Sequence, residues 1–185
     1  STGTYFVEPH KQRGWWLRTD TYPTRAWYSD AGDPDSVYVN NNLDFSDSET
    51  IGDQITGAVG NFEGKLVVFT EKAVWTVSGT GAVIGNIRDW TRVRSNAQIG
   101  AASHRGIVRL PAGVRYPDAN GVIQTTDRAS LAYFTPNGDI RLIAGGMEDA
   151  GDIIISLPVR TTLSTFTYGS RNKIHALHDS ANQQI

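Results

Sequence analysis

The chain has 185 residues, of which 39% are hydrophobic and 19% charged, below the ~25% charged share of typical globular domains. Seventeen basic and 19 acidic residues leave a net charge of −2, so no global basic field would draw the chain to nucleic acid. No apolar stretch approaches the ~20 residues of a membrane helix, and no charged-then-apolar leader pattern opens the sequence, so we expect no membrane association. The absence of cysteine excludes disulfides and thiolate metal sites, and is compatible with folding in a reducing cytoplasm.

The first quarter of the chain predicts short strands separated by turns. The expected strands are residues 4–7, 14–17, 25–28 and 37–39. Residues 29–36 are almost entirely Asp, Gly, Pro and Ser, which predicts a turn. Residues 40–53 predict a polar, acidic loop anchored by Leu43, Phe45 and Ile51.

The stretch 52–79 predicts a three-stranded meander. Its strands are expected at 55–62, 66–70 and 73–77, separated by the turn residues Glu63-Gly64-Lys65 and Glu71-Lys72. The middle run, Leu-Val-Val-Phe-Thr, is too short and too rich in β-branched residues for a helix. It predicts a strand that is buried on both faces.

The second half repeats this plan. After a loop at 80–88 and an alternating strand at 89–94, residues 99–110 resemble the first strand of a new meander. An excursion at 111–128 then precedes 131–145, which matches 66–79: an apolar run ending Phe-Thr, a polar turn, an alternating strand and a glycine. Its Pro-Asn-Gly turn strongly indicates a hairpin.

The spacing of these copies predicts a repeat of about 42 residues. Phe69 and Phe134 are 65 residues apart, and the excursion accounts for about 20 of them. Weaker copies lie at 25–30 and at 173–179, the latter preceded by an expected strand at 162–168. Propeller blades repeat every ~40–50 residues.

We therefore expect an all-β, β-propeller-like fold of repeated antiparallel meanders, either an arc or part of a larger propeller. Residues 1–185 would form one such domain, with an inserted loop at 111–128. We expect the sequence to be one stretch of a longer protein rather than a processed chain. Open sheet edges would be covered by more chain or by neighbouring subunits.

Two acidic clusters raise the alternative of a calcium site, because hard cations favour several oxygen ligands. The clusters are Asp30, Asp33 and Asp35, and Asp44, Asp47, Glu49 and Asp53. Their spacing departs from the alternating ligand pattern, and Asp, Gly and Pro are residues that turns require in any case. We expect solvated turns, and neither a metal nor another cofactor.

No catalytic constellation is visible, so we expect a protein that is not an enzyme. The histidines are His10, His104, His175 and His178, and we interpret them as polar surface residues. Three residues separate His175 from His178, so a strand would point them to opposite faces. No nucleophile elbow, dinucleotide-binding fingerprint or P-loop occurs.

The five tryptophans suggest either sugar stacking or burial in a core or interface, of which burial is the commoner role. Trp75 lies in an alternating strand and is expected in the core. Trp15 and Trp16 are adjacent, so a strand would send them to opposite faces, and one of the two would need a second surface to cover it. This pair is our candidate for a subunit interface.

Basic residues are scattered along the chain. The densest set is Arg88, Arg92, Arg94, Arg105, Arg109 and Arg115. Arg92 and Arg94 would share one strand face. We favour a solvated face over a DNA-contacting patch.

Residues 27–156 resemble the tail-hub or nozzle proteins of short-tailed bacteriophages. The segments that carry the resemblance, in order, are 27–35 (WYSDAGDPD), 52–57 (GDQITG), 65–79 (KLVVFTEKAVWTVSG), 89–91 (DWT), 99–100 (IG), 133–138 (YFTPNG) and 155–158 (ISLP). Together they span about 130 of the 185 residues. Each segment alone is only strand-turn-strand, so the specificity of the resemblance lies in their order and spacing.

The resemblance implies a structural virion protein. The family's fold is a β-propeller-like body with inserted domains, and six copies surround the exit channel beneath the portal and adaptor. The implied partners are sister copies, the portal, the adaptor and other tail proteins, with transient non-specific contact to exiting DNA. Assembly would take place in the host cytoplasm, and no catalytic residues are implied.

Two alternatives remain open. A glycan-binding receptor module of a phage tail would need two or more tryptophans exposed in one groove. A propeller glycosidase would need two carboxylates facing each other about 5 to 9.5 Å apart across a pocket.

Overall fold

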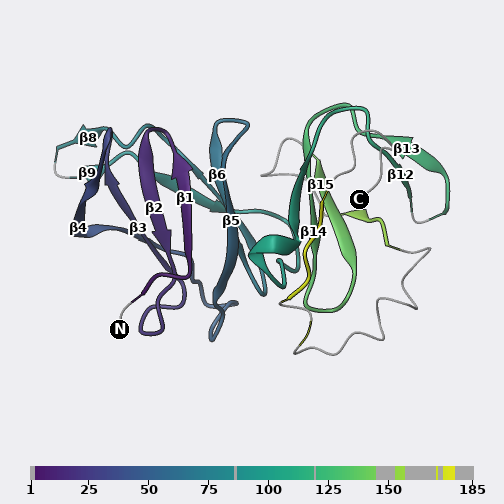
Figure 1. Ribbon diagram of the computed structural model, residues 1–185, viewed down its shortest axis with the longest axis horizontal. Helices are drawn as coiled ribbons and strands as arrows, with labels where there is room; N and C mark the ends of the chain where they lie inside the picture. Colours follow the sequence, from purple (N-terminus) through teal and green to yellow (C-terminus); the bar gives the residue numbers. More distant parts are fainter. Residues whose placement is uncertain are drawn as a thin grey trace. The chain divides into compact units, whose positions relative to one another are not determined.

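The structure is a computed structural model that describes residues 3–85, 87–118, 120–144, 153–156, 170 and 173–177. The chain divides into two compact units, Ser1–Arg94 and Ser95–Ile185. Both units are built from antiparallel strands, so the expected all-β class is confirmed (Figure 1). The assignment of the chain to one domain stays a prediction.

The first sheet of unit 1 has the order β1-β2-β3-β4. Its strands are β1 (Phe6–His10), β2 (Arg13–Leu17), β3 (Arg25–Asp30) and β4 (Asp33–Asp44). The turn between β1 and β2 is Lys11-Gln12, and both residues have positive φ, 47° and 59°. Such angles at both central positions match the right-handed twist of a two-residue hairpin. Compared with the expected strand 4–7, β1 begins two residues later and runs to His10.

The second sheet of unit 1 has the order β10-β7-β6-β5. Its strands are β5 (Ile55–Phe62), β6 (Lys65–Thr70), β7 (Val74–Ser78) and β10 (Thr91–Arg94). The predicted meander is therefore confirmed, and five of the six β6 residues are buried, as its apolar run indicates. Glu63 and Gly64 have positive φ, 48° and 76°, in the two-residue turn that pairs Phe62 with Lys65.

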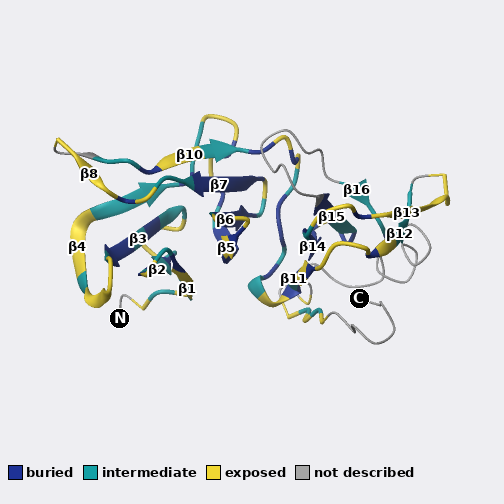
Figure 2. Cartoon of the chain, turned by 90° about the horizontal axis from the view of Figure 1, so that it is seen from above, coloured by how far each residue is buried: buried dark blue, intermediate teal, exposed yellow. Residues whose placement is uncertain are grey.

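One hydrophobic cluster joins the two sheets of unit 1. The buried members are Trp15, Leu17, Ala26, Tyr28, Phe45, Ile55, Ala58, Leu66, Val68, Ala73, Trp75, Val77 and Trp90. The β2 residues among them alternate with partly exposed ones, so the sheet β1-β2-β3-β4 has one core face and one outer face (Figure 2). Trp75 lies in this core, as predicted.

Unit 1 departs from the sequence predictions in three places. Residues 33–44, expected to be the end of a turn, a brief strand and the start of a loop, form the 12-residue strand β4. The actual turn is shorter, because Asp30 already pairs with Asp33 around Ala31-Gly32. Residues 80–88, expected as a loop, contain the hairpin of β8 (Val83–Ile84) and β9 (Ile87–Arg88). Ile51, expected as an anchor, is 77% exposed, whereas Phe45 is buried and Leu43 packs against the core.

Unit 2 repeats the four-stranded plan in the order β11-β14-β15-β16. Its strands are β11 (Ile107–Leu110), β14 (Ser130–Phe134), β15 (Ile140–Ala144) and β16 (Ile153–Ile154). A 3-10 helix, His104–Gly106, precedes β11, so the strand is shorter than expected. The excursion at 111–128 carries the hairpin of β12 (Arg115–Pro117) and β13 (Ile123–Thr125).

The fourth predicted repeat falls largely outside the described residues. The strand expected at 162–168 and residues 178–179 are not described, and residues 173–177 form no strand. Three four-stranded antiparallel sheets are therefore present in the described chain, and none of them is closed.

Candidate functional site

The outer strand β4 of the first sheet exposes several apolar side chains. β4 ends the order β1-β2-β3-β4, so it pairs with β3 on one side only. Tyr38 and Val39 are 59% and 79% exposed. The pairing of β4 with β3 is irregular here, because the register shifts between Trp27 and Ser29, and Tyr38 and Val39 lie between the paired residues Val37 and Asn42. Such a bulge limits pairing with a further strand, so the exposed side chains of β4 are the groups that a partner would contact. Asn42 partly occupies this edge, because its side-chain amide donates to the Val39 carbonyl at 2.8 Å.

The β8–β9 hairpin adds a second exposed apolar element at the same end of unit 1 (Figures 1 and 2). Val83 and Ile84 at its tip are 60% and 69% exposed. Arg88 ties the hairpin to the β3–β4 turn through an ion pair with Asp30. We call Val37, Tyr38, Val39, Val83 and Ile84 the edge patch. Exposed apolar groups in such numbers are typical of a contact surface for protein.

A buried arginine holds the parts of this region together. Arg13 donates to the carbonyl oxygens of Ser29 at 2.7 Å and Gly81 at 3.1 Å. Burial lowers the pKa of Arg13 and the neighbouring Arg88 charge adds to this, while Asp30 acts in the opposite direction. Arg13 thus links β2, β3 and the segment leading into β8, which fixes the hairpin against the sheet.

The structure separates the two residues of the predicted interface pair. Trp15 is fully buried in the core and therefore unavailable for a subunit contact. Trp16 lies on the outer face of the sheet and is partly exposed. The opposite orientation expected for these neighbours is present, and a subunit contact through Trp16 stays a prediction.

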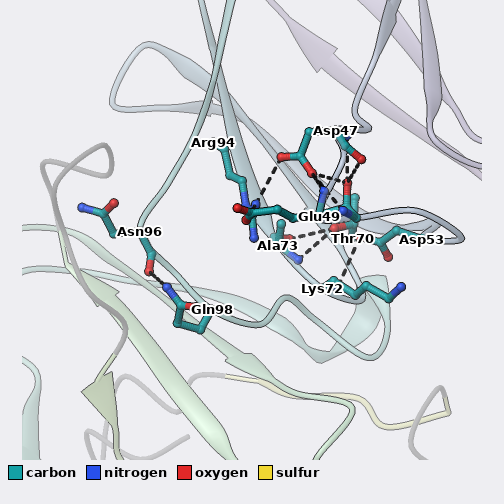
Figure 3. Close-up of polar contacts among 10 residues, drawn as sticks. Asp47, Glu49, Asp53, Thr70, Lys72, Ala73, Arg94, Asn96 and Gln98 are labelled. Atoms are coloured by element: carbon teal, nitrogen blue, oxygen red, sulfur yellow. Dashed lines mark hydrogen bonds and ion pairs between the residues drawn. The ribbon is translucent and has the colours of Figure 1, made fainter.

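The second acidic cluster closes a loop with its own hydrogen bonds (Figure 3). Asp47 accepts from the Thr50 hydroxyl at 2.9 Å and from the backbone N–H groups of Glu49 and Thr50, and it pairs with Arg94. Burial alone would raise the pKa of Asp47, but these donors and the arginine lower it overall. The Asp47 carboxylate thus stabilises this loop by accepting its hydrogen bonds.

Asp53 has a similar role between two turns. It accepts from the backbone N–H groups of Gln54 at 2.8 Å, Glu71 at 2.9 Å and Lys72 at 3.3 Å. In the first cluster, Asp33 accepts from the Asp35 N–H at 3.2 Å, and Asp30 pairs with arginines. These acidic residues thus serve turns and ion pairs. The part of the chain that the structure describes holds no group of three or more acidic or histidine residues arranged to bind a metal.

The histidines are dispersed, and one of them contradicts the surface interpretation. His10 is fully buried, with its Nδ1 3.0 Å from the side-chain oxygen of Asn61. Desolvation lowers the pKa of His10 to about 4, and the nearby Lys11 charge contributes to this shift. His104 starts the 3-10 helix, and the exposed His175 lies 3.2 Å from Arg105. His178 lies outside the described residues.

Of the six arginines in the densest set, Arg92, Arg105, Arg109 and Arg115 are exposed, as expected of a solvated face. Arg92 lies over the Trp75 ring at 5.6 Å, and Arg94 pairs with Asp47 and Glu49. Arg88 pairs with Asp30. Ion pairs thus neutralise Arg88 and Arg94, and the other four arginines stay exposed.

A pocket of about 390 Å³ lies on the outer face of the first sheet. Its walls include the aromatic side chains Trp16, Tyr22 and Trp27. Sequence reasoning did not bring these residues together, although Trp16 and Trp27 both occupy outward positions beside core residues. Among the described residues, no carboxylate lines this pocket, so these residues do not supply the facing acids that the glycosidase alternative requires.

Comparisons with known proteins leave the family open. No protein-family model matches the chain, and no curated protein matches it significantly. Within the described ranges, no helix is long and apolar enough to cross a membrane.

Proposed function

We propose that this protein is a structural component of a bacteriophage tail, a hub or nozzle subunit. Six copies would form a ring around the channel through which DNA is retained and then ejected. The observation that carries the proposal is the open edge strand β4 with the apolar edge patch beside it. The order of short motifs along residues 27–156 supports the choice of a tail protein.

Strand order supports a propeller-like arrangement of the sheets within each subunit. In all three sheets, the strands from one edge to the other follow their order along the chain. In a propeller, each blade is such a four-stranded meander around a central channel. The first strands of the two unit 1 sheets contact each other, since the Gly60 N–H donates to Glu8 at 3.2 Å and Lys11 N–H to Asn61 at 3.1 Å.

The edge patch supports assembly through a neighbouring copy. A sheet edge that stays open is prone to uncontrolled pairing, and charged residues, prolines or a covering partner normally prevent this. Asp33, Pro34 and Asp35 protect the start of β4, and register shifts interrupt its pairing with β3, but the apolar side chains of Tyr38 and Val39 stay exposed. If the patch on one copy meets a different surface on the next, the contact is heterologous and closes into a ring when the rotation permits.

The charge of the chain suits a conduit for DNA. A net charge of −2, with Arg88 and Arg94 already in ion pairs, gives little electrostatic affinity for phosphates. DNA could therefore pass with transient, non-specific contact. Such a ring would be assembled in the host cytoplasm and sit in the virion tail, against the portal or adaptor and other tail proteins.

The oligomeric state tests this proposal. We expect native mass spectrometry to show six copies, and negative-stain electron microscopy to show rings with a channel wide enough for a DNA duplex. Val39→Lys places a charge in the edge patch and should shift the protein towards monomer. Ile51→Lys is the matched control, because Ile51 is 77% exposed and Val39 79%, yet Ile51 lies outside the sheet.

Two outcomes would contradict the proposal. One is a monomer at all concentrations up to about 100 μM, since subunit interfaces of ordinary size associate well below this. The other is a ring whose stability Val39→Lys and Ile51→Lys affect equally, since the edge patch would then not be the contact.

A further inference from the structure

The pocket on the outer face of the first sheet has two tryptophans at its base. Trp16 of β2 and Trp27 of β3 are cross-strand partners, so their side chains project from the same face of the sheet. They alternate with the core residues Trp15, Ala26 and Tyr28, which fixes their outward direction. Two indoles are thus held side by side at the surface.

The indole ring of Trp16 lies over Gly14, which belongs to the same strand, β2. A methyl group at Gly14 would come within 2.5 Å of Cη2 and 2.8 Å of Cζ3 of the indole. The six-membered ring of Trp16 therefore covers the space above Gly14, where any larger residue would have its side chain. This contact positions the indole, which is partly exposed on the outer face of the sheet.

Tyr22 forms a wall of the pocket that is already set in place. Its ring meets Trp27 edge-on, with centroids 5.7 Å apart and planes at 69°. The Arg25 guanidinium stacks on Tyr22 at 4.3 Å, and Thr19 accepts the Tyr22 N–H at 3.1 Å. Because these contacts fix the ring before any ligand arrives, binding would lose little side-chain entropy here.

The remaining lining determines the chemical class of the ligand. The other described lining residues are Thr4, Thr19, Thr21 and Val37, so none of the described lining residues is acidic or basic. Three flat electron-rich rings with hydroxyl groups beside them suit a neutral molecule with an apolar face and a polar rim. A pyranose has this pattern, since its axial C–H groups form a face and its hydroxyls form the rim.

We propose that this pocket binds a neutral oligosaccharide, whose pyranose rings stack on Trp16 and Trp27 and whose hydroxyls reach the threonines. A volume of about 390 Å³ lies within the ~300–1,000 Å³ of small-ligand pockets and is suited to one or two sugar rings. This recognition role differs from ring assembly through the edge patch, although Val37 belongs to both surfaces. It gives the tail component a site for a neutral surface glycan.

Other occupants fit this lining less well. Single-stranded nucleic acid stacks on aromatic rings too, but its sites also need a positive groove along the backbone. Arg25 stacks on Tyr22, but no basic residue is among the described residues that line the pocket. A proline-rich peptide also uses aromatic grooves, but those grooves accommodate an extended chain rather than one or two rings. These alternatives become outcomes of the test.

The experiment uses the full chain and defined neutral probes: cellotetraose, maltotetraose and N-acetylated chitotetraose. Saturation-transfer NMR should show transfer to ring C–H protons of at least one probe, and calorimetry then gives its Kd. Trp27→Ala should weaken that Kd by roughly tenfold or more, as the loss of one stacking ring does elsewhere. Trp27→Phe should restore part of the affinity.

The matched control is Tyr38→Ala, which removes an exposed aromatic side chain that does not line the pocket. It should leave the Kd unchanged, and far-UV circular dichroism should show that all three variants remain folded. Gly14→Ala provides a second route, because it displaces the Trp16 ring without removing it, and binding should weaken.

Several results would overturn this proposal without touching the proposed ring. One is the absence of binding to these probes and to a wider array of neutral glycans. Another is a Trp27→Ala variant that binds as tightly as Tyr38→Ala. Tighter binding of an oligothymidylate or a proline-rich peptide at the same residues would reassign the pocket. A shift to monomer in Trp16→Ala, with no effect on glycan affinity, would assign this face to a second copy.

Discussion

At the scale of single residues, His10 lies in an environment that solvates a positive charge poorly. It is fully buried beside the rings of Trp15 and Trp90, with centroids 6.3 and 6.0 Å away. Its Nε2 has no hydrogen-bond partner among the described residues. Burial lowers its pKa from 6.5 to about 4, so the folded protein keeps this imidazole neutral under ordinary conditions.

This pKa shift predicts a loss of stability in mild acid. As the pH falls below 6.5, the unfolded chain binds a proton at His10 before the folded chain does. The free energy of unfolding should therefore be highest above pH 6.5, where His10 is neutral in both states. It should fall by up to about 3 kcal/mol as the pH decreases to 4. Urea unfolding at several pH values between about 7.5 and 4.5 would measure this decline.

The matched variant for this measurement is His10→Gln. It keeps an amide that can contact Asn61 but does not titrate. We expect His10→Gln to be less stable than the parent at pH 7.5 and to show a much smaller decline below pH 6.5. An equally steep decline in the variant would assign the pH dependence to other groups.

At the scale of elements, the close approach of β1 and β5 depends on Gly60. A methyl group at this position would lie 2.0 Å from the Pro9 carbonyl oxygen, a distance that no backbone tolerates. We expect Gly60→Ala to lower the free energy of unfolding by about 1–3 kcal/mol, because the strands must move apart. Chemical denaturation measures this change. Gly3→Ala is the control, since nothing lies within 4 Å of its added methyl group, and an equal loss there would contradict the explanation.

Two elements, the meander β5-β6-β7 and the β14–β15 hairpin, could be predicted from the sequence. The meander β5-β6-β7 was predictable because apolar runs alternate with turn residues such as Glu63-Gly64. The β14–β15 hairpin was predictable from its Pro-Asn-Gly turn, in which Gly138 has φ 91°. In both cases the signal is local, so neighbouring residues are sufficient to specify the turn.

Other elements depend on contacts distant in sequence. Asp33, Pro34 and Asp35 are turn-forming residues, yet they begin β4, because Ala31-Gly32 already makes the turn and Arg88 holds Asp30. The turn at Lys11-Gln12 was expected from its polar residues, but the positive φ of both residues was not. The aromatic pocket was not predictable either, since it requires the register that pairs Trp16 with Trp27.

At the scale of the whole molecule, the described hydrophobic clusters each lie within one unit. The cluster around Trp15, Leu66 and Trp75 belongs to residues 1–94, and the cluster around Val108 and Leu142 to residues 95–185. All five tryptophans lie in unit 1, so tryptophan fluorescence reports on that unit alone. The two units can therefore be followed separately in one chain.

These separate cores predict that each unit unfolds as its own cooperative body. Leu142 is fully buried, so Leu142→Ala should cost unit 2 about 2–5 kcal/mol. In urea unfolding, part of the far-UV circular dichroism signal should then be lost at a lower urea concentration than in the parent. The midpoint of the tryptophan fluorescence transition should not change. Leu66→Ala, at an equally buried site in unit 1, should instead move the fluorescence transition. If Leu142→Ala shifts fluorescence and circular dichroism together, the units unfold as one, and their cores are coupled more strongly than the described clusters indicate.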